Sequence, residues 1–335
     1  MHPADRPPQP SNVGAVPETT TELSLGAFCE QWIAAISPSL RPTTADSYAH
    51  LLATHVVPRL GCRPVAAIGP GELGALYAEL LSSGRRRGAG GLSPATVRYV
   101  HLVLRHALAD AVAWGYAGRN VAALVRPPRV PRAEIATWSP SELARFLRHV
   151  SGEPLYPAFV LAATTGMRRG EVLGLQWQDI DLDRRRAFVR RSLVVVRYKV
   201  RTSEPKTARG RRAVALDEGT VKVLRDHRRR REEAPGEPGA DDLVFADASG
   251  APVHPIEFAR VFSRRAHRAG LRPIRFHDLR HTYASIALQA GVHPKVVSER
   301  LGHASVAITL DTYSHVMPSL QEEAAERVAA LILGA

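Results

Sequence analysis

The sequence predicts a mainly helical protein with a small antiparallel sheet, built as an all-helical N-terminal domain followed by an α+β C-terminal domain. Three observations predict this class. The chain has 335 residues, which suits two domains of about 100 to 200 residues each. Apolar residues recur at helical spacing through both halves. Only residues 187–216 depart from that spacing, because short runs of β-branched residues alternate there with polar turns, as in a small antiparallel sheet.

The N-terminal domain is expected to span residues 23–125. Its four expected helices begin near Leu23, Thr43, Glu72 and Pro94. The last of them has the clearest start, because Ser93 can cap it and proline fits the first helical position. Thr43 can cap the second helix in the same way.

Two segments with little helical character frame this domain. Residues 1–22 are rich in proline and polar residues and are expected to be flexible. Residues 126–135 contain three prolines and are expected to be a semi-rigid linker, because proline cannot continue a helix. The C-terminal domain, residues 136–335, opens with a capping box from Ser139 to Glu142.

The chain is strongly basic. It carries 45 Lys+Arg against 32 Asp+Glu, a formal net charge of +13. Such a surface suits a polyanion, because neutralising phosphates releases counterions. Only four of the basic residues are lysines, so GC-rich codon usage explains the arginines equally well. Composition alone therefore leaves nucleic-acid binding open.

Cysteine content and hydropathy indicate the cellular compartment. Cys29 and Cys62 are too few for a disulfide framework or a cysteine zinc site, which indicates a reducing cytoplasm. Residues 1–22 have no apolar core of a signal peptide. No later segment approaches the roughly 18 apolar residues of a membrane span. We expect a cytoplasmic protein with no membrane partner.

Four short motifs in the C-terminal domain carry side chains suited to phosphate chemistry. In chain order they are Thr165 to Glu171, Pro205-Lys206-Thr207, His277 to His281, and Leu301-Gly302-His303 followed ten residues later by Tyr313. In the third motif His277 and Arg280 are three residues apart and share a helical face. Arginine can fork onto two phosphate oxygens while the imidazole beside it donates or accepts a proton.

Tyr313 is a weak nucleophile by itself, because a free tyrosine has a pKa of about 10. It needs a cationic site and a base. Arginines, a lysine and histidines would supply both, with the guanidinium groups neutralising charge on the phosphoryl oxygens and a proton donor serving the departing oxygen. Such a site requires no metal and no cofactor.

The order Arg, Lys, His-x-x-Arg, Gly-His, Tyr resembles that of the tyrosine recombinases, also called the phage integrase family, and the resemblance runs from Leu23 to about Leu333. It implies a helical core-binding (SAM-like) domain at 23–125 and the family's catalytic domain at 136–335, closing as a C-shaped clamp on double-stranded DNA. It implies a site-specific recombinase that needs neither metal nor ATP and forms a 3′-phosphotyrosyl intermediate. Four protomers would exchange strands through a Holliday junction, as a homotetramer in the synaptic complex.

The resemblance also assigns roles. Tyr313 matches the nucleophile, and Arg168 and Arg280 match the pair that clamps the scissile phosphate. Glu171 is expected to stabilise a helix start, and Tyr283 is expected to be a packing residue. Neither is included in the predicted site.

The remaining predicted site residues are a lysine and two histidines. Lys206 matches the lysine that protonates the leaving 5′ oxygen. His277 matches the residue that helps to deprotonate the tyrosine, and His303 matches the one that hydrogen-bonds the phosphate. His281 and His315 flank these motifs and are expected to be supporting or ordinary surface histidines.

Other functions stay open at this point. His277, Asp278, His281 and His303 could bind the metal of a phosphohydrolase, although the nearby arginines would repel a cation. A DNA-binding regulator without catalysis is a second alternative, for which intact catalytic positions are a poor fit.

The biological role also has two readings. Only about 20 residues precede the first helix, so the arm-binding domain of many integrases is not expected, and the architecture is nearer to Xer-type resolvases and simple integrases. Integration and excision of a mobile element ranks slightly ahead of the resolution of chromosome or plasmid dimers. An excision factor or a host accessory factor as a further partner is left open.

The C-terminal stretch 320–333 is amphipathic, with Leu320, Ala324, Val328 and Leu331 on one helical face. A helix of this kind needs a partner surface. The resemblance suggests a neighbouring protomer, and packing on its own domain is the equal alternative.

Overall fold

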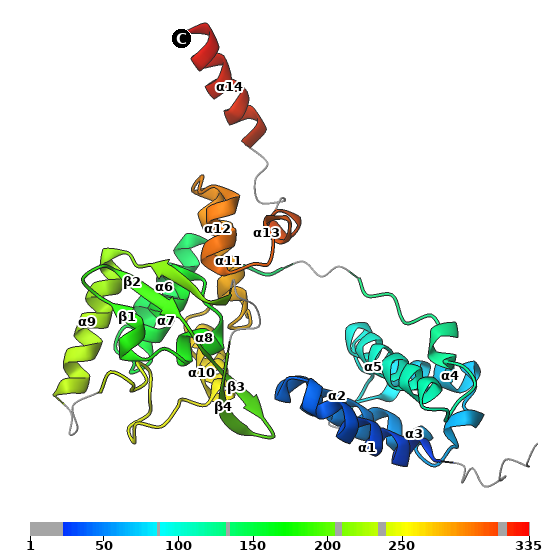
Figure 1. Cartoon of the computed structure of the whole chain (residues 1–335). Coiled ribbons are helices and arrows are strands. Elements are labelled where there is room, and N and C mark those ends of the chain that lie inside the picture. Colours follow the sequence, from blue (N-terminus) through cyan, green and yellow to red (C-terminus); the bar gives the residue numbers. More distant parts are fainter. Residues whose placement is uncertain are drawn as a thin grey trace, which may run out of the picture. The chain divides into compact units, whose positions relative to one another are not determined.

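The computed structural model describes residues 23–85, 88–131, 135–204, 210–233, 239–313 and 320–334, and the chain divides into two compact units, Met1–Arg132 and Ala133–Ala335 (Figure 1). This division falls inside the segment expected to be the linker. The segment 1–22, Lys206 and His315 lie outside the described residues. The fold class is confirmed, since both units are mainly helical and the strands form small antiparallel sheets.

The first unit is helical in its described part. Its α-helices are α1 (Leu25–Ile36), α2 (Pro42–Leu51), α3 (Val57–Leu60), α4 (Pro70–Ser83) and α5 (Pro94–Ala113). Ser93 accepts the amide hydrogen of Thr96 and so caps α5 as expected. The cap expected at Thr43 is wrong, because α2 begins one residue earlier with Pro42 in its first turn. The short α3, joined to α2 by a π-helical turn at Leu52–Val56, was not expected.

The helices of this unit enclose a core that contains two polar contacts. Phe28 and Trp32 of α1 are fully buried, and the Trp32 indole donates to Asp110 at 2.6 Å. The Tyr77 hydroxyl and His101 Nδ1 lie 3.1 Å apart inside the unit. Each buried ring therefore satisfies its polar atom.

The second unit surrounds a core rich in aromatic side chains. Its helices are α6 (Pro140–His149), α7 (Tyr156–Thr165), α8 (Arg169–Leu173), α9 (Glu218–Glu232), α10 (Pro255–Arg268), α11 (Asp278–Gln289), α12 (Pro294–Leu301), α13 (Val306–Tyr313) and α14 (Leu320–Leu333). The capping box that opens α6 is confirmed, because Ser139 and Glu142 bond each other's backbone amides. Rings of Phe146, Phe159 and Phe262 pack within 6.2 Å of one another.

The described strands form two small sheets, where one was expected. Strands β1 (Ile180–Asp181), β2 (Arg186–Val189) and β5 (Arg212–Ala215) form an antiparallel sheet in that order. Between β2 and β5 the chain makes a separate hairpin of β3 (Ser192–Val196) and β4 (Lys199–Ser203). The segment that carries Lys206 follows β4.

Two features of the helices concern the surfaces with which they could make contact. No helix in the described part of the chain is long and apolar enough to cross a bilayer. In α14 the apolar residues Val328, Leu331, Ile332 and Leu333 are exposed.

Candidate active site

The site is built on the sharp turn between α7 and α8. Gly166 ends α7 in the left-handed conformation, with φ of 65°, and a Cβ atom there would lie 2.5 Å from Leu301 and 2.6 Å from Tyr283. Only glycine fits such a position. The turn therefore lies tightly against α11 and α12, and it ends at Arg168, the N-cap residue of α8.

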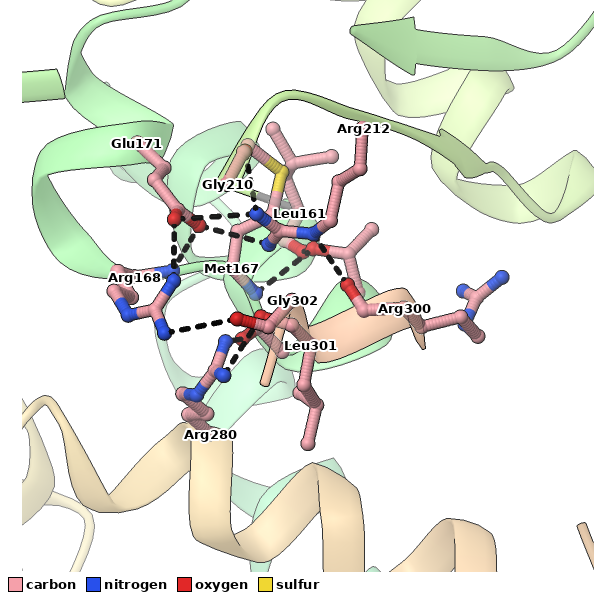
Figure 2. A network of polar contacts seen from close by, with 12 residues as sticks. Leu161, Met167, Arg168, Glu171, Gly210, Arg212, Arg280, Arg300, Leu301 and Gly302 are labelled. Atoms are coloured by element: carbon pink, nitrogen blue, oxygen red, sulfur yellow. Dashed lines mark hydrogen bonds and ion pairs between the residues drawn. The ribbon is translucent and has the colours of Figure 1, made fainter. Parts of the chain in front are cut away.

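Two arginine side chains make hydrogen bonds to the backbone of this turn or of the C-terminal end of α12. Arg280, in the first turn of α11, is only 4% exposed and donates to the carbonyl oxygens of Gly166 at 2.9 Å and Leu301 at 2.7 Å. Arg168 donates to the next carbonyl, that of Gly302, at 3.4 Å. Burial and the charge of Arg168 lower the pKa of Arg280 to about 9, so the group stays cationic at neutral pH. The structure thus brings together the predicted pair of arginines (Figure 2).

A buried carboxylate links Arg168 to a further arginine that the sequence analysis missed. Glu171 accepts from Arg168 at 2.8 Å, and it accepts two bonds from Arg212 of β5, at 3.2 and 2.9 Å. Arg212 also donates to the carbonyl oxygen of Arg300 at 2.6 Å. Figure 2 shows Glu171 lying between the two guanidinium groups.

The expectation for Glu171 is therefore incomplete. It accepts the backbone amide of Arg168 at 2.9 Å and so stabilises the start of α8, as expected. Burial would raise the pKa of its carboxyl, but the hydrogen bonds and charge of Arg212, together with Arg168, hold that pKa below its ordinary value. Glu171 is therefore an anion that fixes two cations.

The predicted nucleophile is buried against a histidine. Tyr313, the last residue of α13, is 1% exposed, and its hydroxyl oxygen lies 2.6 Å from Nδ1 of His281. Burial raises the pKa of Tyr313 to about 12, although the charge of Arg280 acts in the opposite direction. His281 was expected to be a supporting or surface residue, and the structure places it against the reactive atom. The signal that the sequence carried was its position directly after Arg280 in the third motif.

The two other predicted histidines flank this pair. The ring of His277, at the start of α11, lies edge-on to His281 with 5.4 Å between centroids. Nδ1 of His303 lies 2.8 Å from the Thr309 hydroxyl of α13. Loss of hydration and the positive charge of Arg280 lower the pKa of both histidines to about 4. Both imidazoles are therefore neutral at pH 7.

Two clefts with cationic linings border these residues. One has a volume of about 540 Å³, and Arg168, Arg169, Arg275 and His277 are among its lining residues. The other has a volume of about 390 Å³, and its lining includes Arg211, Arg212, Lys295 and His303. Both linings carry an excess of positive charge and are suited to anions.

The metal-binding alternative finds no support in the geometry. In the described part of the chain no three His, Cys, Asp or Glu side chains form a group that could hold a metal ion. Asp278 instead pairs with Arg275 at 2.8 Å. Of the six predicted site residues, five lie in the described part of this unit, and Lys206 lies outside it.

Known proteins resemble the chain in sequence. The family model described as Phage integrase family matches residues 140–319. A protein named Tyrosine recombinase XerC-like, from Caldanaerobacter subterraneus subsp. tengcongensis, is 31% identical over 258 residues, which are 70% of this chain and 66% of that protein. The ICEBs1 integrase of Bacillus subtilis is 29% identical over 243 residues, 71% of this chain and 66% of the relative. The chain thus spans just under two thirds of the length of each.

Solved structures share the fold. The Tn1549 transposon integrase, in complex with transposon right end DNA, superposes with a TM-score of 0.73 at 21% identity and covers 90% of this chain and 99% of its own. A lambda integrase from a tetramer bound to a Holliday junction gives 0.66 at 18% identity and covers 88% and 78%. The family model spans more than half of the chain, from α6 to beyond Tyr313, and so this chain belongs to the phage integrase family, the tyrosine recombinases.

Proposed function

We propose that the protein is a site-specific DNA recombinase that cleaves and rejoins double-stranded DNA through a 3′-phosphotyrosyl intermediate on Tyr313. One observation carries the proposal. The buried hydroxyl of Tyr313 is held by His281, the residue next to Arg280, and Arg280 shares the turn at 301–302 with Arg168. Nucleophile, base and phosphate-binding cations are thus assembled in one place, as a phosphoryl transfer requires.

The two arginines keep donors for a phosphate. A guanidinium has five N–H groups, and Arg280 uses two nitrogens on carbonyl oxygens. Arg168 uses two on Glu171 and Gly302. The remaining N–H groups can bond the non-bridging oxygens of the scissile phosphate and neutralise the charge that develops on them. We assign Arg168 and Arg280 this role.

The other site residues take the roles that the family resemblance suggests. His303, held by Thr309, is positioned to hydrogen-bond the phosphate. Lys206 protonates the 5′ oxygen as it leaves. His277 lies at the edge of the site beside His281, and the resemblance gives it a share in moving the proton of Tyr313.

The wider assembly follows from the same proposal. Residues 23–125 form the core-binding domain and 136–335 the catalytic domain, which the linker 126–135 joins around the duplex. Four copies assemble on two DNA sites, as lambda integrase does in its tetramer bound to a Holliday junction. The exposed apolar residues of α14 fit a contact with a neighbouring protomer. The enzyme acts in the cytoplasm, and an excision or host accessory factor is a further candidate partner.

The biological role that the relatives favour is integration and excision of a mobile element. The ICEBs1 relative is named an integrase, and the Tn1549 protein is named the integrase of a transposon. Resolution of chromosome or plasmid dimers is the second candidate, because the XerC-like relative has the higher identity of the two reported. Recombination of matched plasmid substrates separates them, since a dimer resolvase recombines two identical sites and an integrase joins two different ones.

The test of the proposed chemistry uses a nicked suicide DNA substrate that carries the candidate attachment site. We expect wild type to form a covalent protein–DNA adduct on a denaturing gel in the presence of EDTA. Tyr313→Phe should form none, whereas Tyr156→Phe, the same change in a tyrosine at the start of α7, should match wild type. An adduct that persists in Tyr313→Phe would refute the assignment of the nucleophile.

A further inference from the structure

We propose that His281 accepts the proton of Tyr313 during DNA cleavage, a role that the family resemblance gives to His277. The inference rests on the proposed function and assigns its base. His281 would then be a catalytic residue, because its imidazole touches the reacting atom itself.

The geometry favours His281 over His277. Nδ1 of His281 and the hydroxyl oxygen of Tyr313 are 2.6 Å apart, and the two ring centroids are 5.7 Å apart. A general base must lie within about 2.6 to 3.2 Å of the proton it removes. No hydrogen bond in the described part of the chain joins His277 to Tyr313, and the ring of His277 contacts His281 edge-on instead.

The main competitor for the proton of Tyr313 is bulk water, and burial of the tyrosine excludes most of it. Tyr313 is 1% exposed, so little bulk water reaches the hydroxyl. In the tautomer of His281 that is protonated on Nε2, the phenol donates its hydrogen to Nδ1. A neutral imidazole has one acceptor nitrogen, and the proposal assigns that nitrogen to Nδ1, the one that faces the tyrosine.

Burial and the charges around His281 keep its imidazole neutral and therefore able to accept a proton. Burial lowers its pKa first, the charges of Arg280 and Arg275 lower it further, and Asp278 opposes them. The neighbouring His277 is neutral at pH 7, since its pKa is about 4. His281 is therefore unprotonated at neutral pH, and its Nδ1 lone pair is free to take the proton once the tyrosine begins to bond to phosphorus.

Cleavage transfers one phosphoryl group and two protons. The Tyr313 oxygen forms a bond to phosphorus, the bond from phosphorus to the 5′ oxygen breaks, and the phenolic proton moves to Nδ1 of His281. The leaving 5′ oxygen takes a proton from Lys206. In the rejoining step a 5′ hydroxyl attacks the phosphotyrosine and returns a proton to Lys206, while the released Tyr313 oxygen recovers its proton from His281. No oxidant, metal or cofactor is consumed.

The test compares His281→Ala with His277→Ala in single-turnover cleavage of the suicide substrate. Each variant is prepared with Tyr313 and with a fluorinated tyrosine, whose phenol is more acidic, inserted at the same position. A general base contributes about 10² to 10⁴ to a rate, so we expect His281→Ala to cleave at least about 10²-fold more slowly. The acidic phenol needs less help from a base and should restore about tenfold or more of that loss. It should restore nothing in His277→Ala.

A second variant separates proton transfer from orientation. Asn in His281→Asn can accept a hydrogen bond from the tyrosine but cannot take up its proton at neutral pH. We expect it to be as slow as His281→Ala, with unchanged DNA binding and thermal unfolding. Cleavage at the wild-type rate by either His281 variant, or rescue in His277→Ala instead, would overturn the inference. If wild type itself forms no adduct, the proposed function fails, whereas an adduct in wild type with undiminished His281 variants sinks only this inference.

Discussion

Replacing Arg212 with alanine should destabilise the phosphate-binding site, although Arg212 lies outside the predicted catalytic set. Arg212 and Glu171 form a buried ion pair, with side chains 7% and 5% exposed. Removing one partner of a buried pair costs about 3 to 5 kcal/mol, because the other charge loses its compensation. Glu171 keeps two bonds from Arg168, so we expect about 3 kcal/mol, the lower end of that range.

Hydrogen exchange of α8 and β5 measures this loss within the second unit. At 1.36 kcal/mol for each factor of ten, 3 kcal/mol corresponds to about 150-fold faster exchange of the protected amides. The matched control is Arg228→Ala, which breaks an Arg–Glu pair with Glu232 whose side chains are 50% and 40% exposed. That change should cost about 0.5 kcal/mol or less.

The pH dependence gives the same prediction a second readout. The folded-state pKa of Glu171 lies below its ordinary value, so its ionisation contributes stability above about pH 4.3 that is lost as the pH falls through the folded pKa. Without Arg212, burial raises that pKa again. The difference between Arg212→Ala and wild type should therefore shrink as the pH is lowered from 7 to 4. Equal exchange in Arg212→Ala and Arg228→Ala, or a difference that grows in acid, would refute the reasoning.

Two further predictions concern the turn and the histidines. Gly166→Ala should lower both stability and cleavage, because its Cβ would collide with Leu301, whose carbonyl oxygen holds Arg280. Thermal unfolding and the yield of covalent adduct measure the two effects. The control is Gly115→Ala, which is also at positive φ but has open space around it. The pKa of His303 falls from 6.5 to about 4 on folding, so the unfolded chain binds more protons in that window and stability should fall as the pH drops from about 6.5 to 4. In His303→Gln that slope should flatten, and an unchanged slope would contradict the assignment.

The sequence predicted the class of fold because its signals are local. The start of α5 follows from Ser93 and Pro94, and the capping box of α6 follows from Ser139 and Glu142. The separate β3–β4 hairpin was missed. Its two-residue turn places Arg197 and Tyr198 at φ of 47° and 63°, a conformation usually taken by Asn and Gly, so the local sequence carried no signal of it.

The candidate site likewise contains residues that the sequence predicted and residues that it did not. Arg168, Arg280 and Tyr313 were assigned to the site from the motifs that carry the family resemblance, and the structure brings them to one region of the second unit. Arg212 and His281 were not assigned to the site. Arg212 reaches Glu171 across 41 residues of chain and His281 reaches Tyr313 across 32, and no periodic pattern predicts contacts over such separations.

The balance of charge explains why this set of residues suits an anion. Around the turn at 301–302, Arg168 and Arg212 pair with Glu171, whereas Arg280 donates to the carbonyl oxygens of Gly166 and Leu301. Burial, and after it the charge of neighbouring cations, lowers the pKa of Arg280 and of both flanking histidines. A bound anion would offset the mutual repulsion of these cations. Glu171 fixes Arg168 and Arg212 without neutralising the whole group, which leaves an ordered site with an excess of positive charge, as preorganised binding of an anion requires.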